Sequence, residues 1–188
     1  GALGEVESVT ADHGQWFGLD PASRLFAPEL AGGALLDLGI YPISFASFVL
    51  GRPRSVTARG TLTSTGVDRQ VSAVLEYASG AQALVSTTLA SRTPTTATIN
   101  GTDARIELGG PFYVPGVVRL VARNGSVAAS EPPRIGGHLG LCHEAAHLAQ
   151  LVAERAAESP LLPLDETVRI LRTIDEIRRQ VGVTYPGE

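Results

Sequence analysis

A His-Glu-x-x-His motif, from His143 to His147, is the most conspicuous candidate for chemistry in this 188-residue sequence. On a helix its two imidazoles would share one face and could hold zinc, with Glu144 polarising a bound water. A catalytic zinc also needs a third ligand at a defined spacing, and no extended H-E-x-x-H-x-x-G-x-x-H pattern supplies one. We therefore expect an amphipathic helix without metal and keep a zinc hydrolase as the less favoured alternative. Residues that could serve as further ligands are His138, Cys142 and Glu166.

A second candidate lies in the run Gly-Gly-Ala-Leu-Leu-Asp-Leu-Gly-Ile-Tyr-Pro at residues 32–42. Asp37 and Tyr41 stand four residues apart, so on a helix their side chains face the same way. A carboxylate beside a phenol is a possible proton-handling pair. The other interpretation, an acidic residue near a helix start and a tyrosine at the edge of the core, stays open at this point.

The composition excludes several other chemistries. All 15 basic residues are arginine, so the chain has no lysine for a Walker A phosphate loop, a Schiff base or a Ser-Lys dyad. The single cysteine cannot form an internal disulfide. The net charge of -4 and the absence of a basic run argue against a nucleic-acid partner, which needs clustered cations. We expect a cytoplasmic protein from a reducing compartment.

The first 53 residues predict a strand, a loop and a helix. Residues 5–12 alternate and contain β-branched side chains, which predicts a strand with no signal peptide before it. Residues 14–33 have the composition of a loop. The apolar spacing at 35–50 predicts a helix that Pro42 kinks or starts and that Gly51 and Pro53 end. The apolar stretch 34–50 is too short and too interrupted to span a membrane.

Residues 54–130 have the pattern of β-structure. The turn sequences at 78–81 and 100–103 predict hairpins, hence antiparallel neighbours, and the alternation predicts one packed face and one wetter face. The expected strands are 55–58, 71–77, 83–89, 95–99, 104–108 and 117–122.

The last fifty residues predict two helices. Residues 143–157 carry Leu148, Leu151 and Val152 on their apolar side. A second helix begins near residue 163 with Asp165 as its N-cap and ends at Gly182. Together these elements predict an α+β fold: a single domain over residues 1–188, with a mainly antiparallel, open-faced sheet and the helices packed on one face.

Six segments of the chain resemble one family. They are the run Arg-Leu-Phe-Ala-Pro at 24–28, the run at 32–42, the opening residues 3–6, and the closing residues 158–167, 174–178 and 182–186. They closely resemble the C-terminal domain of the Gfo/Idh/MocA oxidoreductases, in the branch of glucose-fructose oxidoreductase and dimeric dihydrodiol dehydrogenase. The resemblance covers essentially the whole chain.

In that family a Rossmann domain comes first, holds NAD or NADP, and contributes a lysine to proton transfer. No strand here is followed by G-x-G-x-x-G and a helix. The resemblance therefore implies that residues 1–188 are a substrate-binding and oligomerisation domain. We expect no cofactor-binding residue on this chain, no detectable binding of NAD(P) by the chain alone, and no metal.

The resemblance also implies roles for individual residues. Asp37 corresponds to the active-site acid and Tyr41 to the proton donor or acceptor. Tyrosine rather than histidine at this position favours the sugar or dihydrodiol branch. The loop that would border the substrate pocket contains Trp16, Phe17, Arg24 and Phe26, for which simple packing is an equally open role.

The favoured hypothesis is an NAD(P)-dependent oxidoreductase that acts on a sugar, polyol or trans-dihydrodiol and associates as a homo-oligomer through the sheet face. We expect no nucleic-acid or membrane partner. The non-enzymatic alternative is a sheet-mediated dimerisation module whose site is unused.

Overall fold

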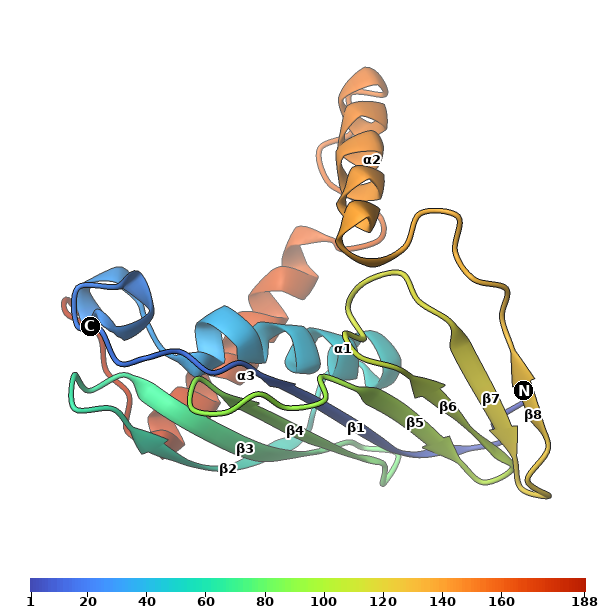
Figure 1. Cartoon of the computed structure of the whole chain (residues 1–188), viewed down its shortest axis with the longest axis horizontal. Helices are drawn as coiled ribbons and strands as arrows, with labels where there is room; N and C mark the ends of the chain where they lie inside the picture. The colour runs from blue at the N-terminus through green and yellow to red at the C-terminus, as the bar shows by residue number, and fades with distance from the viewer.

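An open sheet of eight strands forms the base of the molecule (Figure 1). The computed structural model describes residues 1–188. The strand order is β2-β3-β4-β1-β5-β6-β7-β8, and every neighbouring pair is antiparallel except β1 and β4. The predicted α+β class with a mainly antiparallel sheet is confirmed. The strands are β1 (Val6–Gly14), β2 (Ser55–Leu62), β3 (Asp68–Glu76), β4 (Gln82–Thr88), β5 (Ala97–Gly101), β6 (Ala104–Leu108), β7 (Val118–Ala122) and β8 (Val127–Ala129).

The first strand lies in the middle of the sheet, where it joins β2–β4 to β5–β8. Its alternate residues Val9, Ala11 and His13 all point into the buried face. The sequence did not indicate this central place, because a helix and the β2–β3 hairpin separate β1 from β4 along the chain. The sequence analysis also missed β8, whose three exposed residues are too few to show an alternating pattern.

Two helices cover one face of the sheet, as predicted. They are α1 (Ile40–Leu50) and α3 (Leu164–Val181). Their apolar sides bury Ile43 and Ala46 from α1, and Ile174 and Ile177 from α3, against β1–β4 in the main core. The segment Pro28–Leu50 is apolar and long enough to cross a membrane by composition alone, but here it supplies core residues of the domain.

Short helical turns lead into α1. These are η1 (Arg24–Phe26), η2 (Pro28–Leu30) and η3 (Leu35–Gly39), the last with π-helical geometry. Pro42 has no N–H to donate to the carbonyl four residues back, that of Leu38. Directly before this gap the helix takes the wider π form, in which backbone bonds span one more residue. The irregularity predicted at Pro42 is therefore a π-helical turn before the proline.

The remaining helix, α2 (Leu141–Ala153), stands away from the sheet and buries no residue (Figure 1). The expectation that this helix packs on the sheet is wrong. Its apolar residues have helical spacing, but the chain on both sides carries the helix beyond the sheet, so Leu148 and Val152 are exposed. It follows the short turn η4 (Gly137–Gly140).

Asp165 is not the N-cap of α3, as the sequence had suggested. The helix begins one residue earlier, at Leu164, so Asp165 lies in the first turn. The Leu164 N–H instead donates to Glu158 Oε2 at 2.7 Å. A side chain from the preceding loop thus satisfies the free backbone group.

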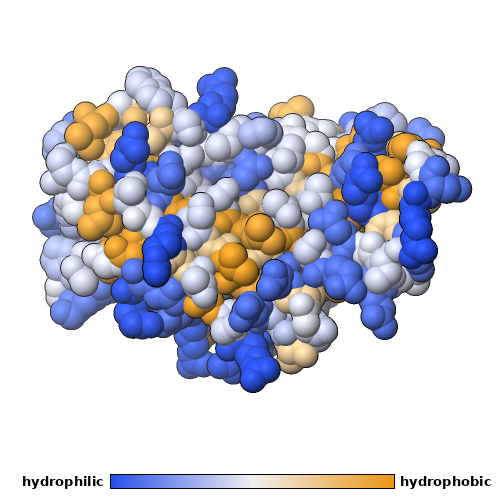
Figure 2. Space-filling view, turned by 90° about the horizontal axis from the view of Figure 1, so that it is seen from below, coloured by the Kyte–Doolittle hydropathy of each residue, from blue (hydrophilic) through white to orange (hydrophobic).

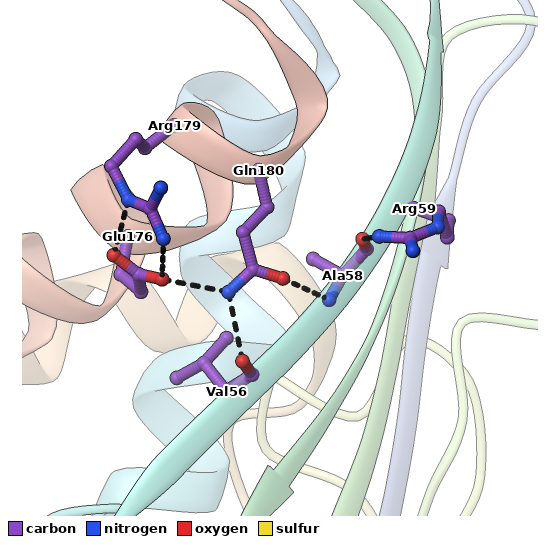
Figure 3. A network of polar contacts seen from close by, with 6 residues as sticks. All are labelled: Val56, Ala58, Arg59, Glu176, Arg179 and Gln180. Carbon is purple, nitrogen blue, oxygen red and sulfur yellow. Dashed lines mark hydrogen bonds and ion pairs between the residues drawn. The ribbon is translucent and has the colours of Figure 1, made fainter.

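At its other end, α3 closes the exposed edge of β2 (Figure 3). Gln180 Oε1 accepts from the Ala58 N–H at 2.8 Å, and Gln180 Nε2 donates to the Val56 carbonyl at 2.8 Å. Glu176 orients the amide by accepting from Gln180 Nε2 at 2.7 Å and is itself paired with Arg179. One glutamine therefore replaces the backbone partner that β2 lacks.

A buried carboxylate organises the turn that precedes η3. The Leu35 N–H donates to Asp68 Oδ2 at 2.6 Å, and Asp68 is fully buried. Gly33 has φ +120°, and a Cβ there would come within 2.1 Å of Asp68 Oδ1. The Tyr185 hydroxyl donates to the Gly32 carbonyl at 2.6 Å from the other side. This turn therefore requires glycine both for its backbone angle and for space.

Burial raises the pKa of Asp68 to about 6, against the lowering effect of the hydrogen bond from the Leu35 N–H and the charge of Arg178. Because the folded value exceeds the ordinary 3.8, the associated stabilisation is fully present below pH 3.8 and is lost as the pH rises through 6.

We expect Asp68→Asn to remove this pH dependence, since asparagine keeps an oxygen for the Leu35 N–H but does not ionise. The difference in unfolding free energy between variant and wild type should change by about 3 kcal/mol from acid to neutral pH. Urea unfolding of both proteins across this range measures it, with the exposed Asp165→Asn as control. Parallel pH curves for wild type and Asp68→Asn would contradict the assignment.

Candidate functional site

Tyr41, the second residue of α1, presents a phenol at the surface beside an aromatic cluster. Its side chain is 41 % exposed. Its ring centroid lies 4.5 Å from that of Tyr113 and 5.1 Å from that of His13, the latter nearly edge-on at 76°. Three segments far apart in sequence, β1, α1 and the loop between β6 and β7, therefore hold the Tyr41 ring between them.

His13 forms the buried side of this cluster at the end of β1 and is only 2 % exposed. The amide nitrogen of Gln15 lies 3.2 Å from His13 Nε2, and Nδ1 has no hydrogen-bond partner. Burial lowers the pKa of His13, while the Leu38 carbonyl and the carboxylates of Asp12 and Asp37 partly oppose this. The imidazole is therefore neutral at neutral pH.

Asp37 lies on η3 and pairs with Arg24 rather than with Tyr41. The Arg24 Nη1 to Asp37 Oδ1 distance is 2.8 Å, and the Asp37 side chain is mostly buried whereas Arg24 is exposed. The π-helical turn changes the angle between residues 37 and 41, so an α-helical spacing does not describe them. Both side chains act on His13 instead. The charge of Asp37 opposes the lowering of the His13 pKa, and the Tyr41 ring packs against the imidazole.

The hydroxyl of Tyr113 stays protonated beside Tyr41. Burial, followed by the charge of an ionised Tyr41, raises the pKa of Tyr113. Of the two phenols, Tyr113 is the half-buried one and Tyr41 the exposed one. Tyr41 is therefore the phenol that a bound molecule can reach more easily.

An apolar groove of about 730 Å³ starts at Tyr41 and runs along the outer side of α1. Its walls come from α1, from the loop that carries Tyr113, and from the residues before and within the first turns of α3. The apolar residues that line it include Phe45, Phe48, Phe112, Leu161 and Leu162. A phenol at one end of an apolar groove can meet the polar group of a molecule whose body packs on the groove.

The four predicted pocket residues are divided between surface and interior. Trp16 is 69 % exposed, and Arg24 is exposed beside Asp37. Phe26 is 4 % exposed in the smaller core, and Phe17 packs against the same cluster. The structure thus places Trp16 and Arg24 where a ligand can reach them and gives Phe26 a packing position.

The His-Glu-x-x-His segment lies on α2, the helix that stands away from the sheet (Figure 1). His147 Nε2 shares a hydrogen bond of 2.9 Å with the Ser159 hydroxyl. Glu166, the candidate third ligand, accepts from Ser47 and pairs with Arg169 at 2.5 Å. No group of three or more His, Cys, Asp or Glu side chains is placed to hold a metal ion.

Comparisons with known proteins decide the family. Residues 1–107 match the model of the GFO/IDH/MocA C-terminal domain. The chain belongs to this family. It is 34 % identical over 190 residues to trans-1,2-dihydrobenzene-1,2-diol dehydrogenase of Xenopus tropicalis and 32 % identical over 194 residues to that of Sus scrofa, covering 98 % and 99 % of this chain. The chain spans 57 % of the length of each of these relatives.

Solved structures agree with this Gfo/Idh/MocA assignment. The crystal structure of aldose-aldose oxidoreductase from Caulobacter crescentus, complexed with glycerol, superposes with a TM-score of 0.81 at 26 % identity and covers 96 % of this chain and 55 % of the other. A 3-ketoreductase from Actinomadura kijaniata, with a TM-score of 0.80 at 22 % identity over 96 % of this chain and 55 % of the other, shares the fold.

The residues of this Gfo/Idh/MocA domain do not fit the pyrophosphate of a nicotinamide cofactor. A dinucleotide site places the pyrophosphate on a helix N-terminus that follows a glycine-rich turn. Here the helix after Gly32 and Gly33 already receives the Asp68 carboxylate at the Leu35 N–H. An anion cannot share that position with a buried carboxylate.

Sequence reasoning missed His13 and Tyr113. The signal for His13 was present, because it continues the inward series Val9 and Ala11 at the end of a strand, where a polar residue is unexpected. Tyr113 had no comparable signal, since an aromatic residue in a loop does not show which helix it meets.

We expect the protein to contain no stoichiometric zinc, because neither α2 nor its surroundings supply a third ligand. Elemental analysis of protein purified without chelator measures this, with His147→Ala as the matched variant. One zinc per chain in the wild type that is lost in His147→Ala would contradict the prediction.

Proposed function

We propose that this chain is the substrate-binding domain of an NAD(P)-dependent oxidoreductase that acts on a sugar, polyol or trans-dihydrodiol, with Tyr41 as the proton donor or acceptor. The observation that carries the proposal is the exposed Tyr41 phenol in the lining of the apolar groove, four residues after the Asp37 carboxylate that pairs with Arg24. The relatives named above, a dihydrodiol dehydrogenase and an aldose-aldose oxidoreductase, support this substrate class.

The proton is the part of the reaction that falls to this chain. In such enzymes the nicotinamide cofactor carries the hydride, and the protein supplies binding, orientation and the proton. A phenol ordinarily holds its proton up to about pH 10, so a proton acceptor of this kind needs a cation close by. Arg24 is already paired with Asp37. The family resemblance assigns the cation to a lysine of the Rossmann domain.

Asp37 serves as an orienting group in this proposal. Its side chain is mostly buried and is held by Arg24 at 2.8 Å, which fixes one carboxylate oxygen. The other oxygen has no partner among the hydrogen bonds of the structure and is free to accept from a substrate hydroxyl or from that lysine. The substrate would thus lie between Asp37 and Tyr41, over the rim formed by Trp16.

The second candidate is a non-catalytic dimerisation module, which the open face of the sheet favours (Figure 2). Hydrophobic side chains gather near the middle of this face. Leu84 on β4 is 46 % exposed and is paired with Val74 on β3 and Thr10 on β1. Together they line a shallow hollow of about 480 Å³. We propose that a second copy of the chain covers this face, whether or not the site is catalytic.

We expect the protein to be a dimer or a higher even assembly, and we expect Leu84→Arg to dissociate it by placing a charge in the middle of the contact. Light scattering across a range of concentrations measures the mass, with Leu19→Arg, an exposed loop leucine, as control. A monomeric wild type at high concentration would count against the proposal.

Tyr41→Phe in the full-length enzyme should lower turnover by roughly 10²-fold or more, the usual contribution of a positioned acid or base, and leave nucleotide affinity unchanged. Steady-state kinetics on the best substrate and nucleotide titration measure the two quantities. The matched control is Tyr77→Phe, which removes a buried hydroxyl without a hydrogen-bond partner in the main core.

If Tyr41→Phe kept nearly full activity, Tyr41 would be a packing residue and the module without catalysis would be the better description. Loss of activity in both phenylalanine variants would point to a folding defect, which circular dichroism of the two proteins would show directly.

A further inference from the structure

We propose that His13 is a positioning residue for Tyr41, which holds the phenol in place while the imidazole is neutral and releases it when the imidazole is protonated. The kinetic consequence rests on the function proposed above. The structural consequence, a response of the Tyr41 ring to the charge on His13, does not.

The first support is the contact itself. His13 lies beneath the Tyr41 and Tyr113 rings, with centroids 5.1 and 4.9 Å away. At 2 % exposure its ring meets protein instead of water, so it has one packed position. Because β1 lies in the centre of the sheet and stays paired with β4 through His13 to Gly14, the backbone holds the imidazole against which Tyr41 packs in a fixed place.

The hydrogen bonding of His13 defines its neutral form. The Gln15 amide nitrogen, a donor only, lies 3.2 Å from His13 Nε2, which therefore accepts and carries no proton. The neutral ring then carries its proton on Nδ1. Protonation of His13 Nε2 would place its N–H opposite the N–H of the Gln15 amide. The Gln15 amide would have to rotate before His13 Nε2–H could find a hydrogen-bond acceptor.

The charged and titratable groups around His13 come from five segments. Asp12 precedes it on β1, but its carboxylate already accepts from the Thr95 and Thr96 N–H groups. Asp37 on η3 is paired with Arg24. Tyr41 on α1 and Tyr113 in the loop contribute their phenol rings, and His138 of η4 lies beyond Tyr113, 6.2 Å from its ring. Asp12 is engaged by backbone N–H groups and Asp37 by Arg24, so neither carboxylate forms an ion pair with His13, although the charge of each partly favours the protonated ring.

A new charge in this position cannot be accommodated without movement. Burial lowers the pKa of His13, so protonation takes place below the ordinary histidine value. The protonated ring must gain partners or solvent, and the exposed side of the cluster is Tyr41. The Tyr41 ring therefore shifts with the charge on His13.

A histidine that only fills space would behave differently. Phenylalanine has a planar ring of nearly the same size, so it would still pack against Tyr41 but would not titrate. His13→Phe thus separates packing from ionisation, and His143→Phe makes the same chemical change at an exposed histidine of α2 that contacts neither Tyr41 nor Tyr113 by its ring.

Nuclear magnetic resonance of the intact protein, labelled in the histidine Cε1 and the tyrosine rings, tests the coupling without any assay of activity. His13→Phe and Tyr41→Phe assign the two signals. We expect the Tyr41 ring signal to move with the same midpoint as His13, to lose this dependence in His13→Phe and to keep it in His143→Phe. A Tyr41 signal that ignores the His13 titration would overturn the proposal.

The second measurement is the pH profile of kcat/KM for the full-length enzyme. We expect the acidic limb to move by at least one pH unit toward lower pH in His13→Phe and to stay in place in His143→Phe. An unmoved limb in His13→Phe would also overturn the proposal. If Tyr41→Phe is as active as the wild type, the proposed function fails instead, and the resonance experiment alone decides the role of His13.

Discussion

The bond between the Asp68 carboxylate and the Leu35 N–H is the constraint on which the candidate site depends. It places a fully buried acidic group at the start of the helical segment that carries Asp37 and Tyr41. Burying a carboxylate is unfavourable unless hydrogen bonds and positive potential compensate for lost hydration. The N-terminus of the helix and the nearby Arg178 supply part of this compensation, and the remaining cost of burial raises the pKa of Asp68 to about 6. Because the bond is directional, it fixes where that helix begins relative to β3.

The rest of the site follows from this fixed start. Tyr185 ties the preceding glycine turn to the end of the chain, and Arg178 stacks on the Tyr185 ring at 4.3 Å while pairing with Glu188. The start of β3, the glycine turn and the C-terminal residues thus meet at one point. The phenol of Tyr41 is displayed from a segment that is held by groups distant in sequence.

Much of this could be predicted from the sequence because local rules govern it. The glycine pair, the apolar spacing of α1 and the hairpin turns each act over a few residues, and the family pattern around Asp37 and Tyr41 was recognisable. The π-helical turn was not, because spacing alone cannot show how a helix adapts to Pro42. The position of α2 was not predicted correctly, because an amphipathic pattern shows which side of a helix is apolar but not what that side packs against. The role of Tyr113 depends on tertiary contacts alone.

The closure of β2 by Gln180 has a consequence for how the sheet can grow. An uncovered edge strand offers a row of backbone donors and acceptors to any other strand, which leads to unlimited ribbon-like polymers. At β2 the side chain of Gln180 already occupies the donor of Ala58 and the acceptor of Val56. The opposite edge, β8, has only three residues and offers a short ladder. With a donor and an acceptor of one edge occupied and the other edge only three residues long, the sheet offers little room for a further strand at either end.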